Sequence, residues 1–224
     1  MNNNILNSRP SIKEQTRPSV LVIDNYDSFV YNLVHYLEDL GCKVTVRRNN
    51  ELTLEEVEKY DKILLSPGPG IPDEAGLLKD IISKYAPSKS IFGVCLGQQA
   101  IGEVFGGKLQ NLPDVFHGVA SKIKVCVQDE SLFSGLEQEM EVGRYHSWVV
   151  DGKLPDCLEA TSYDENGQVM SLRHRDFDVK AVQFHPESVL TPQGKKMLEN
   201  WVNSPNPALS QDPDAANAEP NIKL

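Results

Sequence analysis

A cysteine flanked by two glycines is the residue of this sequence best suited to covalent chemistry. Cys95 stands between Gly93 and Gly97. An apolar run at 91–94 precedes it, and a segment with helical character follows at 98–105. The G-x-nucleophile-x-G pattern is typical of a sharp strand-to-helix turn that raises one side chain above the strand ends. Free N–H groups and the dipole of the following helix would favour a thiolate there. A buried structural cysteine between closely packed glycines fits the pattern equally well.

A histidine and a glutamate two residues apart could supply the base that such a cysteine needs. His185 and Glu187 follow a predicted strand, and in an extended segment they point the same way. Glu187 would then hold the imidazole while His185 takes the Cys95 proton. Pro186 between them restricts the backbone. A solvent-exposed surface pair is the alternative, and a zinc site is disfavoured because no second thiol or histidine lies at ligand spacing.

His146 is a rival for the role of base, because it also lies at the end of a predicted strand. We favour His185, since it alone has a carboxylate at a spacing that would orient the ring. His117 and His174 have no such partner in the sequence and are expected to be structural or exposed.

The turn Ser-Pro-Gly-Pro-Gly at 66–70 is a candidate oxyanion-binding loop. Its two prolines have no N–H, so Gly68 and Gly70 are the available donors. The Leu96 N–H, next to the cysteine, would be the second donor. A rigid loop without a catalytic role is the alternative, and the G-K-[ST] ending of a phosphate loop is missing.

The elements expected around these residues alternate between short apolar strands and helices. We expect strands at 20–23, 43–47, 63–65 and 91–94, with helices at 30–40, 53–60, 77–85 and 98–105. This alternation predicts an α/β fold with a doubly wound, mostly parallel sheet. Sites in such sheets lie beyond the carboxyl ends of the strands, where the segments 24–28, 66–70 and 95–99 can meet.

The second part of the chain predicts an added antiparallel, hairpin-rich region. Strands with period two are expected at 122–127, 141–145, 158–163, 169–174 and 179–184. Asn166-Gly167 is a strong hairpin turn between two of them. Thr191-Pro192 predicts the start of a last helix running to about Val202, with the threonine as cap and the proline at the first position.

Composition limits the class of protein. The 224 residues suit one domain at 19–203, with a disordered leader at 1–18 and a disordered tail at 204–224. The net charge of −10 argues against general affinity for nucleic acid or an anionic membrane. No apolar run approaches the ~20 residues that span a bilayer. Four widely spaced cysteines without a C-x-x-C pair fit a reducing cytosol, so we expect a soluble, cytoplasmic protein.

Three motifs together resemble the class I glutamine amidotransferases. They are Gly-Val-Cys-Leu-Gly-Gln-Gln at 93–99, Ser-Pro-Gly-Pro-Gly at 66–70 and Phe-His-Pro-Glu-Ser at 184–188. Their order and spacing are also those of the family, over roughly residues 19–203. The segments 24–29 and 144–147 look like the branch that serves chorismate-using synthases, either as anthranilate synthase component II or as aminodeoxychorismate synthase component II. The resemblance implies the flavodoxin-like fold of this class.

The resemblance implies a glutaminase. Cys95 would attack the side-chain amide of L-glutamine, His185 would protonate the departing ammonia, and Glu187 would orient His185. Water would then release glutamate from a thioester. Oxyanion and glutamine contacts are implied for Gly68, Pro69, Gly70, Leu96, Gln99, Ser147 and Trp148.

The ammonia would pass to a separate chorismate-binding subunit, resembling anthranilate synthase component I. The segment that would face this partner comprises Asp24, Asn25, Tyr26, Asp27 and Ser28. No metal or other cofactor is expected on this chain, whereas the partner of such systems resembles Mg²⁺-dependent enzymes.

Three positions depart from the family pattern. Val119 stands where a lysine is usual, Ala120 replaces a hydroxyl residue in the same partner-facing loop, and Trp148 replaces a smaller leucine. A backbone contact to glutamine at Trp148 would tolerate that change.

Our first hypothesis is ammonia supply for anthranilate and hence tryptophan synthesis. The alternatives are ammonia supply for folate synthesis, a regulatory or scaffold subunit without turnover, and an amidotransferase with another acceptor, such as a nucleotide synthetase.

Overall fold

The computed structural model describes residues 17–205, so most of the leader expected at 1–18 and of the tail expected at 204–224 lies outside the described residues. The helices are α1 (Val30–Asp39), α2 (Leu54–Val57), α3 (Leu78–Tyr85), α4 (Leu96–Val104) and α5 (Gly194–Asn203). The strands are β1 (Ser19–Asp24), β2 (Lys43–Arg48), β3 (Lys62–Leu65), β4 (Ser90–Val94), β5 (Leu109–Asn111), β6 (Val119–Val125), β7 (Glu139–Arg144), β8 (Trp148–Val150), β9 (Leu158–Asp164), β10 (Val169–His174) and β11 (Val179–Val182). Within 17–205, no helix is long and apolar enough to cross a bilayer.

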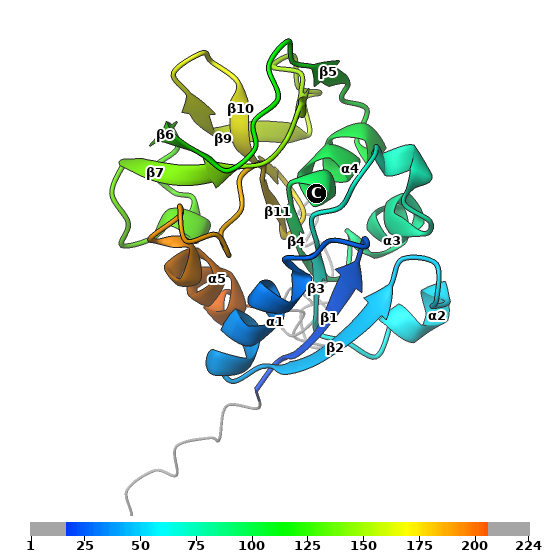
Figure 1. The fold of residues 1–224 in the computed structure, drawn as a ribbon. Coiled ribbons are helices and arrows are strands. Elements are labelled where there is room, and N and C mark those ends of the chain that lie inside the picture. Colours follow the sequence, from blue (N-terminus) through cyan, green and yellow to red (C-terminus); the bar gives the residue numbers. More distant parts are fainter. Residues whose placement is uncertain (1–16, 206–224) are drawn as a thin grey trace, which may run out of the picture.

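Nine strands form one sheet in the order β2-β1-β3-β4-β11-β10-β9-β6-β7. The strands from β2 to β11 run parallel, and those from β11 to β7 pair antiparallel (Figure 1). The predicted doubly wound α/β fold with an antiparallel extension is therefore confirmed. β5 and β8 form a separate two-stranded sheet that the sequence did not predict.

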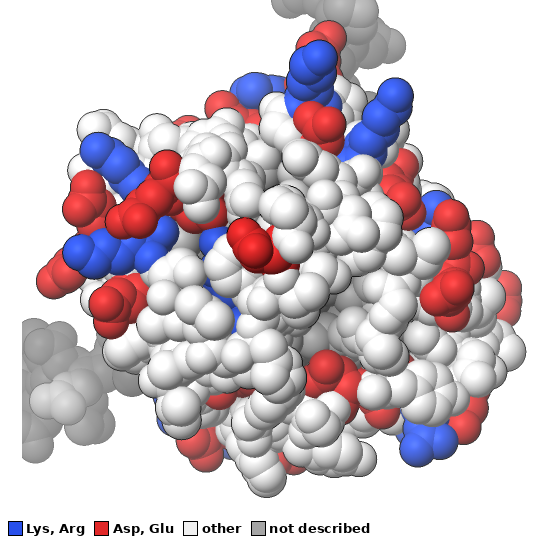
Figure 2. Space-filling model, turned by 45° about the horizontal axis from the view of Figure 1, so that its top comes forward, with Lys and Arg blue, Asp and Glu red and all other residues white. Residues whose placement is uncertain are grey.

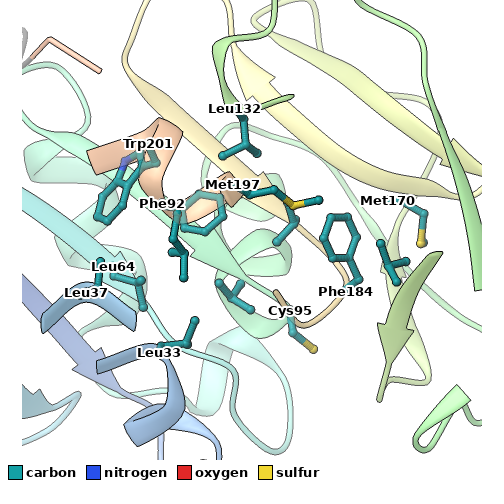
Figure 3. Packing of buried hydrophobic residues seen from close by; sticks show 14 of the residues in the cluster. Leu33, Leu37, Leu64, Phe92, Cys95, Leu132, Met170, Phe184, Met197 and Trp201 are labelled. Carbon is teal, nitrogen blue, oxygen red and sulfur yellow. The ribbon is translucent and has the colours of Figure 1, made fainter. Parts of the chain in front are cut away.

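Helices cover both faces of the parallel part (Figure 1). α1 and α5 pack on one face, and α2, α3 and α4 pack on the other. On the first face, the rings of Phe92 and Trp201 lie 5.5 Å apart, and Met197 continues the apolar cluster (Figure 3). Cys95 lies at the margin of this cluster, where β4 ends. The nucleophile candidate is thus held between a packed core and the carboxyl edge of the sheet.

Two helices differ from the expectation. The capping box of α2 is present, since the Thr53 N–H donates to Glu56 Oε2 at 2.8 Å, but the helix ends already at Val57. α5 begins at Gly194 rather than at Pro192, so the prediction of Thr191 as its cap was wrong. The physical reason is that the Thr191 hydroxyl donates to the His185 carbonyl oxygen instead of accepting from the helix.

Candidate active site

Cys95 occupies the sharp turn between β4 and α4. Its φ of 53° is a conformation that residues with a Cβ rarely adopt. The neighbouring glycines make the turn possible. A Cβ on Gly93 would lie 2.7 Å from the Gly97 carbonyl carbon, and one on Gly97 would lie 2.6 Å from the Leu65 oxygen. The backbone of α4 therefore approaches β3 and β4 closely enough to present the cysteine above the strand ends, as the sequence pattern predicted.

His185 and Glu187 form a buried pair. Nδ1 of His185 lies 2.6 Å from Glu187 Oε1, and the two residues are only 2% and 3% exposed. The alternative of a solvent-exposed surface pair is therefore wrong. Burial opposes a charge on His185, but the nearby Cys95 thiol and Glu187 outweigh it and raise the pKa of His185 well above its usual value. Nε2 of His185 has no hydrogen-bond partner of ordinary geometry in residues 17–205, so it is free to exchange a proton.

Parallel strand pairing brings this pair to the cysteine. Val182 at the end of β11 is in register with Val94 at the end of β4, and the Cys95 N–H donates to the Val182 oxygen at 2.8 Å. The chain that continues from β11 therefore runs beside the elbow. Residues far apart in the sequence meet because both follow neighbouring strands.

The segment that carries His185 is fixed by β7 and by the start of α5. The His185 N–H donates to the Gly143 oxygen at 2.9 Å. The Thr191 hydroxyl donates to the His185 oxygen at 2.7 Å and accepts from the Gly143 N–H at 2.9 Å. A Cβ on Gly194 would lie 1.8 Å from the Pro186 oxygen, so only glycine fits at the first residue of α5.

Gly194→Ala is expected to disturb this segment. We expect a loss of about 1–3 kcal/mol in the free energy of unfolding, because the new methyl group overlaps backbone that cannot easily move. Urea unfolding measures this loss. Gly152→Ala is the matched control, since a Cβ there meets nothing within 4 Å, and its effect should stay within about 0.5 kcal/mol. Equal stability of the two variants would contradict the close contact.

His146 has a different environment from His185. Its Nε2 accepts a hydrogen bond from Arg144 Nε at 3.1 Å, and Arg144 itself forms a buried ion pair with Asp164 at 2.7 Å. Burial, followed by the positive charges of Arg144 and His185, lowers the pKa of His146 to about 3. The ring is therefore neutral at physiological pH and uses one nitrogen to accept the Arg144 N–H. It is poorly suited to be the general base.

His146 should also make the fold sensitive to acid. Its folded pKa of about 3 lies below the ordinary value of 6.5, so between these pH values the unfolded chain binds a proton that the folded chain does not. Stability is then lost as the pH falls, by up to about 1.4 kcal/mol per pH unit from this residue. Urea unfolding at pH 7 and pH 5 should show a smaller loss for His146→Gln than for the natural chain. An equal loss would contradict the burial of a neutral ring.

The proposed oxyanion donors lie around the start of α4. Leu96 is the first residue of the helix, so its N–H has no partner within the helix. The turn at 66–70 packs against it, since a Cβ on Gly68 would lie 2.7 Å from Leu96 Cδ2 and 2.6 Å from Asn25 Cβ. Gly70 has a φ of 73°, and Pro69 before it has no N–H to donate. The turn and the helix start are thus next to each other, as the candidate oxyanion site requires.

The residues expected to contact glutamine are partly engaged with one another. Gln99 Nε2 donates to the Trp148 carbonyl oxygen at 3.0 Å and to Gln183 Oε1 at 3.4 Å. The Ser147 carbonyl oxygen accepts from the Leu112 N–H at 2.7 Å. The Trp148 carbonyl oxygen thus already accepts from Gln99, and a backbone contact between Trp148 and glutamine stays a prediction.

Asn25 does not lie on the surface with the rest of the segment 24–28. It is 2% exposed; its N–H donates to Ser66 Oγ at 2.9 Å and its Nδ2 to the Ser66 carbonyl oxygen at 2.8 Å. Asn25 thus joins the turn after β1 to the turn after β3 and is not available to a partner. Tyr26 is 49% exposed, and Asp24, Asp27 and Ser28 are exposed or half-buried.

Two aromatic residues beside His185 were not assigned a role from the sequence. The rings of Tyr145 and Phe29 lie 4.9 Å and 6.1 Å from the His185 ring. The Tyr145 hydroxyl lies 3.2 Å from Ser188 Oγ, within hydrogen-bonding distance. Both aromatics are next to motif residues in the sequence, but a contact with His185 cannot be inferred from their spacing along the chain.

Residues 17–205 hold no group of three or more His, Cys, Asp or Glu placed to bind a metal ion.

Comparisons with known proteins show the family of this chain. The family model of class I glutamine amidotransferases matches residues 21–204. Aminodeoxychorismate synthase component 2 of Escherichia coli (strain K12) is 46% identical over 82% of this chain and 99% of its own. Anthranilate synthase beta subunit 2, chloroplastic, of Oryza sativa subsp. japonica is 43% identical over 88% of this chain and 74% of its own.

The bifunctional protein TrpGD of Thermotoga maritima is 44% identical, and the match covers 82% of this chain and 32% of that longer protein. Among solved structures, a putative GMP synthase protein from Thermoplasma acidophilum superposes with a TM-score of 0.75 at 26% identity, over 83% of this chain and 92% of the other. The residues that the family model matches include the elbow, the turn at 66–70 and the buried His-Glu pair. This chain belongs to the class I glutamine amidotransferase family.

Proposed function

We propose that this chain is the glutaminase subunit of a chorismate-using synthase. It hydrolyses L-glutamine and supplies the ammonia to a separate synthase subunit that makes anthranilate. The observation that carries the proposal is the buried pair of His185 and Glu187 beside the strained Cys95 elbow, at the carboxyl edge of the sheet. The strained φ of Cys95 beside this pair disfavours a scaffold that has lost turnover, because such strain is typical of functional sites.

The first half of the proposed reaction forms a thioester. The Cys95 proton moves to His185 Nε2, and the thiolate attacks the amide carbon of glutamine. The Leu96 N–H and the turn at 66–70 stabilise the oxyanion of the tetrahedral intermediate. The intermediate then collapses as His185 returns the proton to the amide nitrogen, which leaves as ammonia. Glu187 keeps the ring oriented and stabilises its positive charge.

The second half regenerates the enzyme. Neutral His185 takes a proton from a water molecule, and the resulting hydroxide attacks the thioester carbon. The oxyanion donors stabilise this second intermediate as they did the first. Glutamate leaves when the carbon–sulfur bond breaks, and the Cys95 sulfur recovers its proton from His185.

The surface around the site supports a protein partner. Tyr26 and Phe29, just after β1, are 49% and 37% exposed, and Val189, directly after the Glu187 segment, is 93% exposed. On the face turned forward in Figure 2, most charged side chains lie toward the margin, and a few acidic ones lie nearer the middle. Exposed aromatic and aliphatic side chains are typical of the centre of a protein–protein interface.

Aminodeoxychorismate synthesis is a second candidate for the pathway. Relatives named for each synthase match this chain at similar identity, 46% and 43%, so the glutaminase role is supported independently of the acceptor reaction. The segment 24–29 and the triad spacing fit both pathways, and anthranilate is our first hypothesis of the two. One glutaminase could also serve both synthases.

Reconstitution tests the proposal. The chain is mixed with glutamine, chorismate and either an anthranilate synthase large subunit or an aminodeoxychorismate synthase component I, and both glutamate and aromatic product are measured. We expect that the anthranilate synthase partner increases glutamate release and that the mixture yields anthranilate. Aminated product only with the other partner would move the chain to the second candidate. The partner subunits are first shown to be active with ammonia as nitrogen donor. If neither mixture then releases glutamate, the proposed function is contradicted.

A further inference from the structure

Gln183 is a fully buried glutamine directly beside the nucleophile. It follows β11, as Cys95 follows β4, and these parallel strands end in register. Its backbone N–H donates to the Met170 oxygen at 2.8 Å, which fixes the main chain at this point. Its side-chain Nε2 lies 3.5 Å from the Cys95 sulfur and donates to it. The reaction proposed for the Cys95 site gives this side chain no role.

The orientation of the Gln183 amide follows from its neighbours. Gln99 Nε2 donates to the Trp148 carbonyl oxygen, and a carbonyl can only accept, so the NH₂ end of the Gln99 amide is fixed there. That same NH₂ group lies 3.4 Å from the Gln183 amide and must meet an acceptor, which places Gln183 Oε1 toward it. The NH₂ end of Gln183 then points to the Cys95 sulfur. A backbone carbonyl thus determines, through two amides, that the sulfur receives a donor.

We propose that Gln183 is a further catalytic residue, whose amide N–H stabilises the Cys95 thiolate. A hydrogen bond to an anion is stronger than one to a neutral atom, so this contact strengthens when the thiol proton moves to His185. It favours the thiolate over the thiol, and the low dielectric of the buried site increases the effect. Gln99 acts as a positioning residue for Gln183. The inference rests on the proposed role of Cys95 as nucleophile.

Alkylation of the thiol tests this directly and needs neither glutamine nor a partner. The rate of Cys95 modification by iodoacetamide, followed by peptide mass spectrometry across pH 5–10, gives the apparent thiol pKa because only the thiolate reacts. We expect Gln183→Met to raise that pKa by about one unit, and to lower the glutaminase rate about tenfold or more. Gln99→Met should shift it in the same direction but less, because Gln183 remains and only its orientation is released.

Gln98 provides the matched control. It is also fully buried and lies on α4, but its amide donates to the Val169 oxygen at 3.3 Å rather than to the sulfur. Gln98→Met should leave the alkylation profile unchanged. A folded Gln183→Met with the natural profile would overturn the inference. If Gln183→Met does not fold, a natural profile in Gln99→Met would overturn it.

The two claims can fail separately. If the natural chain releases glutamate but Gln183→Met leaves the thiol pKa unchanged, only the role of Gln183 is rejected. If Gln183→Met shifts the thiol pKa but the natural chain releases no glutamate with an active partner, the proposed function is rejected. The contact between Gln183 and Cys95 then still stands.

Discussion

Cys95→Ala should abolish glutamine-dependent product, by at least about 10³-fold, while leaving ammonia-dependent product unchanged. The Cys95 thiol is the group that attacks glutamine in the proposed reaction. The acceptor site is on the other subunit, which ammonium salts can supply directly. Alanine fits the site, because the side chain lies at the margin of a packed cluster and loses only its sulfur. The measurement is product formation by the reconstituted complex with glutamine and then with ammonium as nitrogen donor.

Cys126→Ala is the matched control, since Cys126 is an exposed free thiol far from the elbow in sequence. It should retain both activities. Loss of ammonia-dependent product in Cys95→Ala, with the complex still assembled, would contradict the division of work between the two subunits. Retained glutamine-dependent product would remove Cys95 as the nucleophile.

His185→Ala should reduce the glutaminase rate by about 10²–10⁴-fold, far more than His146→Ala. His185 is paired with Glu187, and its pKa is raised by Cys95 and Glu187 in spite of burial, so its ring can carry the transferred proton. His146 is held neutral, with its pKa lowered to about 3, and one nitrogen already accepts from Arg144. Steady-state glutamate release at saturating glutamine measures both variants.

The two substitutions should also differ in stability. His146→Ala removes a buried acceptor of Arg144 and is expected to weaken the fold by about 1–3 kcal/mol, with the glutaminase rate of the remaining folded protein largely kept. Urea unfolding of both variants separates this effect from catalysis. The reverse ranking in glutaminase rate would assign the role of base to His146.

The fold was predictable where the pattern is local. Alternating apolar strands and helices indicated the parallel half, and the glycines around Cys95 indicated the elbow, because both are properties of a few consecutive residues. β5 and β8 were missed, since strands of three residues carry no periodicity. α5 was placed too early because the Thr191 hydroxyl, a good cap by composition, bonds His185 and Gly143 instead.

The site was predictable in its reactive groups and less so in their surroundings. Motifs singled out Cys95, His185 and Glu187, each with a neighbour that suggested its chemistry. Asn25, in contrast, sits in an exposed-looking polar segment and is buried by a contact 41 residues away with Ser66. Contacts of that range are decided by which strands become neighbours, and a single sequence does not record them.

Trapping of the covalent intermediate tests the central claim most directly. The chain is incubated with uniformly ¹⁴C-labelled glutamine and the partner synthase, quenched in acid, and digested for peptide mapping. We predict that label is retained as a glutamyl thioester on the peptide that contains Cys95, and that Cys95→Ala retains none. Label on another peptide, or glutamate release by the natural chain with no retained label under conditions where thioesters survive, would contradict hydrolysis through Cys95.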